Sequence, residues 1–208
     1  MRIGVDYRFL SAGVLAVNRG MGRYTQQQLR ETLALDEHNE YILFCLPDAD
    51  RTLILPSILA APNVTVAEID ISQTRRLGPV TIHTDRQSIL RHAEEYQDWI
   101  YKQRVDLYHA TAPYVWYDIP LIDFNVCPYV STYYDAIPLA YSPYYLSPGS
   151  LLAELCVYAN EVTRRSDRLI AISNSARQDA INYLGFREER IDIAYPIETR
   201  TLANGLRV

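Results

Sequence analysis

The sequence predicts an α/β domain of three layers built around a mostly parallel β-sheet. Along the whole chain, short runs of apolar and β-branched residues alternate with longer segments of helical periodicity, which is typical of repeated βαβ units. The chain has 208 residues, of which 49% are hydrophobic and 22% charged, and this fits one globular domain with a full core. The expected fold class is therefore α/β and Rossmann-like.

The elements of the first half follow from local patterns. An apolar run ending in Asp6 predicts the first strand, and the glycine-bearing loop after it leads into a helix from about Gly22 to Leu35. Thr84 to Gln87 has the form of a capping box and predicts a helix that continues to about Arg104. The strands expected in this half are residues 3–6, 41–46 and 64–71, with a short helical segment before the third.

The second half continues the alternation. A helix is expected from about Ser150 to Arg165, and Ser173 and Ser175 are placed to cap another that stops at Gly185. The strands expected here are residues 105–109, 128–132, 169–172 and 191–195. Residues 1–196 then form one domain, and residues 197–208 are a tail or the start of an interdomain linker.

Composition excludes several classes of protein. The net charge of −5 gives no global attraction to polyanions, so we expect no nucleic-acid partner. With Lys102 as the sole lysine there is little scope for Schiff-base chemistry, whereas arginine suits anion recognition. The three scattered cysteines and four scattered histidines predict neither a disulfide framework nor a metal site. Reduced thiols and the early Asp6 favour the cytoplasm.

The loop before the first helix is the first candidate site. Gly20 and Gly22 open the helix, and Arg19 and Arg23 add positive charge there, so backbone N–H groups could hold an anion. The loop also matches two glycines of a dinucleotide fingerprint, with Thr25 in the third position. Asp48 would be the ribose acceptor in that interpretation. A flexible loop with two surface arginines is the third possibility.

Two strand ends carry further candidates, because open α/β sheets bind ligands at this edge. His109 could accept a proton, and Asp135 could bind a sugar hydroxyl; alternatively, His109 is structural and Asp135 caps a turn. Tyrosines are abundant between Tyr96 and Tyr158, with Trp99 and Trp116 among them. They could form a saccharide platform or simply fill the core.

Five ordered motifs resemble one family. Ile3–Leu10 with Gly20–Tyr24 resembles the opening of family-four (group 1) glycosyltransferases, and Thr132–Leu139 resembles their T-x-H-D-x-I-P-L segment. The other matching segments are Asp106–Pro113, Ala171–Arg177 and Leu184–Phe186 continuing to Tyr195 and Pro196. The resemblance spans almost the whole chain and implies the N-terminal domain of a GT-B fold.

The resemblance implies the acceptor-side half of a two-domain enzyme. Such an enzyme moves a sugar, with retention and without a metal or other cofactor, from a nucleotide sugar to a saccharide, lipid-linked or other hydroxylated acceptor. By carry-over, the catalytic residues would be His109, Tyr134 and Asp135. The substrate-binding residues would be Gly20, Gly22, Arg23, Tyr24, Ser173 and Ser175. Members often touch the cytoplasmic membrane surface, so peripheral membrane contact stays open.

Two departures from the family bear on activity. Tyr134 stands where the family carries histidine, and a phenol does not accept a proton at neutral pH. The family's C-terminal donor-binding domain has no counterpart in these 208 residues, so we expect the chain alone to be inactive. The alternative function is a non-catalytic binding or assembly module, and the third is a dinucleotide-binding domain.

Overall fold

A parallel sheet forms the centre of the protein. The computed structural model describes residues 1–46, 49–68, 86–113 and 121–196. Its seven described strands are all parallel, in the order β3-β2-β1-β4-β5-β6-β7. The strands are β1 (Arg2–Asp6), β2 (Glu40–Cys45), β3 (Val64–Glu68), β4 (Leu107–Ala110), β5 (Tyr129–Tyr133), β6 (Arg168–Ala171) and β7 (Ile191–Ile193). The predicted Rossmann-like α/β class is confirmed.

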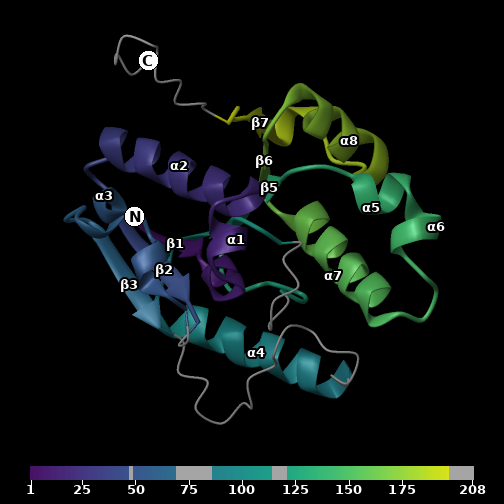
Figure 1. The fold of residues 1–208 in the computed structure, drawn as a ribbon, viewed down its shortest axis with the longest axis horizontal. Helices are drawn as coiled ribbons and strands as arrows, with labels where there is room; N and C mark the ends of the chain where they lie inside the picture. Colours follow the sequence, from purple (N-terminus) through teal and green to yellow (C-terminus); the bar gives the residue numbers. More distant parts are fainter. Residues whose placement is uncertain (47–48, 69–85, 114–120, 197–208) are drawn as a thin grey trace.

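Helices cover both faces of the sheet, and Figure 1 shows α2 and α4 on opposite sides of the strands. The α-helices described are α1 (Val14–Val17), α2 (Gly20–Leu35), α3 (Pro56–Leu59), α4 (Arg86–Lys102), α5 (Ile137–Ala140), α6 (Ser142–Tyr145), α7 (Leu151–Arg165) and α8 (Asn174–Leu184). Three short 3-10 helices are η1 (Arg8–Ala12), η2 (Arg51–Leu53) and η3 (Glu188–Arg190).

One face of the sheet packs on the N-terminal helices. Val5 and Leu43 project from β1 and β2 into a buried cluster with Val17 of α1, Leu29 of α2 and Ile58 of α3. Alternate residues of the same strands face the other way, because successive side chains of a strand point to opposite faces. This layer therefore holds the β1–α2 connection firmly against the strands.

The opposite face packs on α4, α7 and α8. Phe44 and Tyr108 contact Tyr96 of α4, and Val162 of α7 joins the same cluster. Further along the sheet, Ala176, Ala180 and Leu184 of α8 pack on the buried side chains of β6. The two faces together give the three layers that the sequence predicts.

Most of the predicted helix caps are confirmed. Ser150 and Ser173 accept hydrogen bonds from the backbone N–H groups three residues later, and Gly185 ends α8 in the left-handed conformation with φ of 65°. Ser175 is not a cap but the second residue of α8. The capping role fell to Ser173 alone because its own extended backbone places the hydroxyl over the first turn.

Several boundaries differ from the prediction. The loop before Gly20 contains the short helices η1 and α1, and α2 begins at Gly20 rather than Gly22. The short helices α5 and α6 were not predicted. Three predicted element boundaries lie outside the described residues: the capping-box residues Thr84 and Asp85, the strand end at 69–71, and the tail 197–208.

Candidate functional site

Four strands of the described sheet end at one edge around the point where the strand order reverses. The chain winds outward from β1 to β2 and β3, then crosses to β4 on the other side of β1. Open α/β sheets bind ligands in the crevice outside the carboxyl ends of strands at such a reversal. The residues at this edge are Asp6 of β1, Thr111 after β4, Tyr134 after β5 and Ser173 after β6.

The N-terminus of α2 lies in the β1–α2 connection at this edge. Arg19 is the N-cap residue, and no side chain caps the first turn of the helix. Arg19 and Arg23 are exposed, and no acidic residue occurs between Asp6 and Glu31. Uncapped N–H groups, the positive helix end and two cationic side chains together make a surface suited to an anion.

The two glycines of α2 have different roles. A Cβ on Gly22 would lie 2.3 Å from the carbonyl oxygen of Ala16, so only glycine allows α1 to pack this closely. Gly20 has open space around it but a φ of +41°. The pair therefore fixes the path of the chain from α1 into α2, with Gly22 buried against α1 and Gly20 exposed at the start of the helix.

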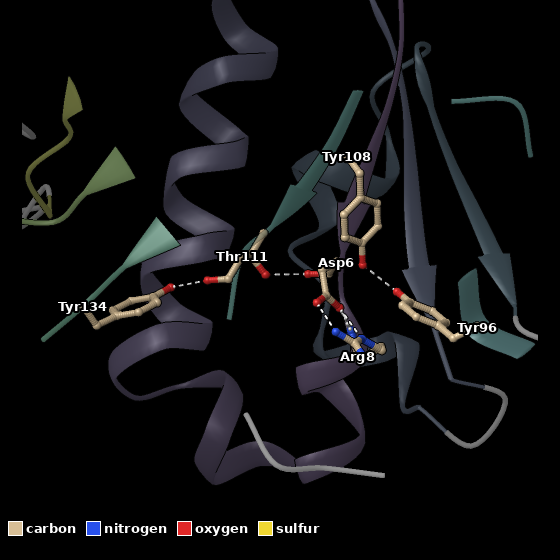
Figure 2. A network of polar contacts seen from close by, with 6 residues as sticks. All are labelled: Asp6, Arg8, Tyr96, Tyr108, Thr111 and Tyr134. Atoms are coloured by element: carbon tan, nitrogen blue, oxygen red, sulfur yellow. Dashed lines mark hydrogen bonds and ion pairs between the residues drawn. The ribbon is translucent and has the colours of Figure 1, made fainter. Parts of the chain in front are cut away.

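A chain of hydrogen bonds crosses the strand ends, and Figure 2 shows it. The hydroxyl of Tyr134 donates to the carbonyl oxygen of Thr111 at 2.9 Å, and the Thr111 hydroxyl donates to the carbonyl oxygen of Asp6 at 2.6 Å. Burial raises the pKa of the Tyr134 phenol well above its ordinary value. Tyr134 is therefore a neutral hydrogen-bond donor whose proton is directed at a backbone carbonyl.

Asp6 and Arg8 continue this chain as a buried ion pair. Nε and Nη2 of Arg8 donate to the two carboxylate oxygens of Asp6 at 2.8 and 2.6 Å, and the exposed fractions are 2% for Asp6 and 6% for Arg8. The Arg8 guanidinium also lies 4.4 Å above the ring of Tyr96, whose hydroxyl is 2.7 Å from that of Tyr108. The pair is buried and supports the strand ends.

His109 points away from the crevice. It lies inside β4 rather than after it, and its Nε2 is 2.9 Å from the hydroxyl oxygen of Thr132. Its neighbours form a cavity of about 180 Å³ between the sheet and α2, lined by Ile3, Val5, Thr25, Gln28, Leu29, Thr32, Tyr41, Leu107, His109, Thr111, Val130 and Ile170. Burial lowers the pKa of His109 to about 4, so its ring is neutral at neutral pH.

Tyr24 joins α2 to the end of the described chain. Its hydroxyl donates to the carbonyl oxygen of Ala194, 2.7 Å away, and its ring meets that of Tyr134 edge to face at 5.7 Å. Burial raises the pKa of Tyr24 to about 12. The two rings pack together at the site and hold α2 next to the strands β5 and β7.

Asp135 is the exposed carboxylate of the candidate set. Its Oδ1 accepts a hydrogen bond from the backbone N–H of Ile137 at 2.9 Å, which starts α5, and in the described structure Oδ2 has no hydrogen-bond partner. Ser173 uses its hydroxyl as the cap of α8, and Ser175 is exposed on that helix. The structure thus brings together Arg23, Tyr24, Tyr134 and Asp135 near one edge and sets His109 behind it.

Sequence reasoning missed the parts that support this edge. Asp6 and Arg8 stand two residues apart at a strand end, and this spacing of opposite charges could have predicted their ion pair. Nothing local marked Thr111, because its partners come from β1 and β5. Asp48 and Trp116 lie outside the described residues.

The described ranges contain neither a metal-binding cluster nor a membrane-spanning helix. No three His, Cys, Asp or Glu side chains there lie close enough together to hold a metal ion. None of the helices in those ranges has the length and apolar character needed to cross a membrane. All three cysteines are free, as the sequence predicts.

Comparison with known proteins decides the family. A family model described as Glycosyltransferase Family 4 matches residues 18–197. The chain belongs to Glycosyltransferase Family 4. The resemblance noted from the five motifs is confirmed, and the candidate edge is the edge of a glycosyltransferase-type domain. No curated protein matches the chain.

Three solved structures of low identity match most of this chain. A glycosyltransferase from Rickettsia africae ESF-5 is 17% identical with a TM-score of 0.46, and the match covers 93% of this chain and 42% of that one. Anabaena Alr3699/HepE in complex with UDP is 15% identical with a TM-score of 0.45, covering 94% and 43%. The lipopolysaccharide outer core galactosyltransferase WaaB is 13% identical with a TM-score of 0.47, covering 97% and 48%. This chain spans less than half the length of each.

Proposed function

We propose that this chain is the acceptor-side half of a retaining, metal-independent glycosyltransferase. It works in the cytoplasm with a C-terminal domain that binds a nucleotide sugar, and the acceptor is a saccharide, lipid-linked or other hydroxylated molecule. Within the family, the fold supplies one wall of the cleft, and the residues at the strand ends decide what this wall binds.

One observation carries the proposal: the exposed, uncapped N-terminus of α2 stands at the sheet edge where the strand order reverses. Arg19 and Arg23 add two charges in a segment without acidic residues, although the whole chain has a net charge of −5. This local reversal of sign suits the diphosphate of a nucleotide sugar. A leaving diphosphate can be stabilised by helix-end N–H groups and arginines without a metal.

The transfer itself breaks one bond and forms another. The bond between the anomeric carbon and the diphosphate oxygen breaks, and the acceptor oxygen bonds to that carbon on the same face. The proton of the acceptor hydroxyl passes to the departing diphosphate, so no side chain of the enzyme has to act as a base. Asp135 orients that hydroxyl through its free Oδ2.

The neutral groups of the site agree with this assignment. Tyr134 directs its proton at the Thr111 carbonyl, and His109 faces the cavity beneath α2. Neither is placed to take a proton from an acceptor at this edge. The proposal therefore assigns Tyr134 to shaping the pocket together with Tyr24.

A non-catalytic binding or assembly module is the second candidate. The observation that favours it is Tyr134 in place of histidine, with its hydroxyl bonded to the protein backbone. Thr25, in the third glycine position of a dinucleotide fingerprint, is buried and within 3.4 Å of the Tyr134 hydroxyl, which gives the dinucleotide alternative no added support.

Thermal unfolding of this chain with a ligand panel separates the proposed function from the dinucleotide alternative. We would use UDP-, GDP- and ADP-sugars and NAD, each far above ordinary dissociation constants, because a ligand stabilises in proportion to its occupancy of the native state. The proposal predicts a shift of under about 1 °C with every sugar nucleotide, since the donor is held chiefly by the other domain. A shift of several degrees with NAD alone would replace it with the dinucleotide function.

A further inference from the structure

The described tyrosines range from fully buried to largely exposed. Tyr96, Tyr108, Tyr129 and Tyr133 are buried in the core and cannot meet a ligand. Tyr141, Tyr144 and Tyr145 are exposed by 58%, 85% and 47%, and we call these three the tyrosine surface. These three large aromatic side chains are exposed within one short segment, and such a cluster points to a binding surface.

Two short helices frame the tyrosine surface. Tyr144 and Tyr145 belong to α6 and Tyr141 lies between α5 and α6, helices of four residues that each have a proline in the first turn, Pro138 and Pro143. The two helices contact each other and lie between α7 and α8 in the view of Figure 1. Because proline fixes its own φ, the rings are presented with little backbone freedom to lose on binding.

The tyrosine surface follows the candidate site along the chain. The carboxylate of Asp135 accepts a hydrogen bond from the backbone N–H of Ile137, so α5 starts directly beside the residue assigned to orient the acceptor hydroxyl, and Tyr141 comes directly after α5. Asp135 and the tyrosine surface therefore stand at the two ends of one short segment.

Charge and chemistry select the kind of ligand. No lysine or arginine occurs between Ala136 and Thr163, and the anionic surface of a membrane attracts basic segments. Among the described hydrogen bonds, none involves the hydroxyls of Tyr141, Tyr144 or Tyr145. A phenol ring packs on the apolar face of a sugar while its hydroxyl bonds the sugar's hydroxyls, which suits a neutral carbohydrate.

We infer that the tyrosine surface binds the distal units of a neutral oligosaccharide acceptor, so that the enzyme extends a chain of several sugars. This inference rests on the proposed function, since it names the acceptor class of the same site. Asp135 holds the terminal unit that receives the new sugar, and Tyr144, the most exposed ring, stacks on a unit further along.

Calorimetry and a glycan array with the full chain test the inference. The probes are neutral glucose, galactose and mannose oligosaccharides of one to seven units. We expect affinity for at least one series to rise with length, and Tyr144→Ala to weaken the longest member about fivefold to tenfold while leaving the single unit unchanged. Tyr183→Ala, which removes a 44%-exposed tyrosine from α8, is the matched control and should change neither.

Three results would overturn the inference. One is no binding of any series, or binding that does not depend on length or on Tyr144. Another is loss, in Tyr144→Ala, of binding to neutral phosphatidylcholine vesicles, which would make the surface a lipid contact. The third is self-association that Tyr144→Ala abolishes, seen by sedimentation.

The inference and the proposed function can fail separately. Sugar transfer that is equally efficient with one unit and with seven, and unaffected by Tyr144→Ala, would remove the inference and leave the function. Oligosaccharide binding that depends on Tyr144, in a complete polypeptide that transfers no sugar, would remove the function and leave a carbohydrate-binding surface.

Discussion

The hydroxyl of Tyr134 donates its proton to the carbonyl oxygen of Thr111, 2.9 Å away, and this bond ties the end of β5 to the end of β4. The same hydroxyl lies 3.4 Å from the Thr25 hydroxyl of α2. At a position where the family carries histidine, the protein therefore has a neutral donor that connects two strands and a helix.

Removing that hydroxyl should cost stability. Tyr134→Phe deletes the bond to Thr111 and leaves a mostly enclosed carbonyl oxygen without it, so we expect a loss of about 1–2 kcal/mol in the free energy of unfolding. Urea unfolding followed by circular dichroism measures it. The control is Tyr141→Phe, which changes an exposed tyrosine just before α6 and should alter the free energy of unfolding by less than about 0.5 kcal/mol. Equal effects of the two substitutions would contradict the assignment.

The Asp6–Arg8 pair should matter far more than an exposed pair. Asp6→Asn leaves Arg8 charged and enclosed, and breaking a buried ion pair in this way costs about 3–5 kcal/mol. The matched control is Asp192→Asn, which breaks the exposed pair with Arg168 and should cost under about 1 kcal/mol. Urea unfolding at constant pH compares them, and similar losses would show that Asp6 is not enclosed as described.

His109 should make stability depend on pH. Its pKa in the folded protein is about 4, below the ordinary value of 6.5, so between these values the unfolded chain binds more protons. Stability should therefore be full above about pH 6.5 and fall as pH drops toward 4, by on the order of 3 kcal/mol.

The control for this pH effect is a pair of substitutions. His109→Gln should flatten the stability profile between pH 4 and 6.5, whereas His38→Gln, at an exposed position, should leave its slope unchanged. Urea unfolding midpoints across that range supply the profile. A slope that survives His109→Gln would assign the effect to other groups.

Gly22 should tolerate no side chain. In Gly22→Ala the new Cβ would meet the Ala16 carbonyl at 2.3 Å, a backbone contact that α1 can relieve only by moving, at a cost of about 1–3 kcal/mol. Gly20→Ala meets no atom and bears only the strain of its positive φ, about 1 kcal/mol. Thermal unfolding should therefore show the larger drop for Gly22→Ala, and the reverse order would be inconsistent with the close α1–α2 contact.

Local patterns predicted most of the fold because strands and helices here are marked by their own residues. Residues 3–6 and 169–172 read as buried strands, and Ser150, Ser173 and Gly185 marked helix ends that the structure confirms. The helices α5 and α6 were missed because four residues are too few to show a helical period, and their prolines read as breakers.

The site was harder to predict because its contacts cross the sheet. Tyr134 and Thr111 are brought together only by the pairing of β4 with β5, and Thr111 and Asp6 only by the pairing of β1 with β4. His109 shows how much one residue matters: β4 continues to Ala110, so the ring belongs to the face under α2 and not to the crevice.

The most direct measurement of the central claim is sugar transfer by the complete polypeptide that contains this chain. UDP-, GDP- and ADP-sugars would be offered with a library of hydroxylated acceptors in the presence of EDTA, with products identified by mass spectrometry and NMR. The account predicts one added sugar with the donor's anomeric configuration, activity that survives EDTA, and at least a hundredfold lower kcat/KM for Asp135→Asn, about 3 kcal/mol of transition-state stabilisation. No transfer from any donor, an inverted product, or full activity of Asp135→Asn would contradict it.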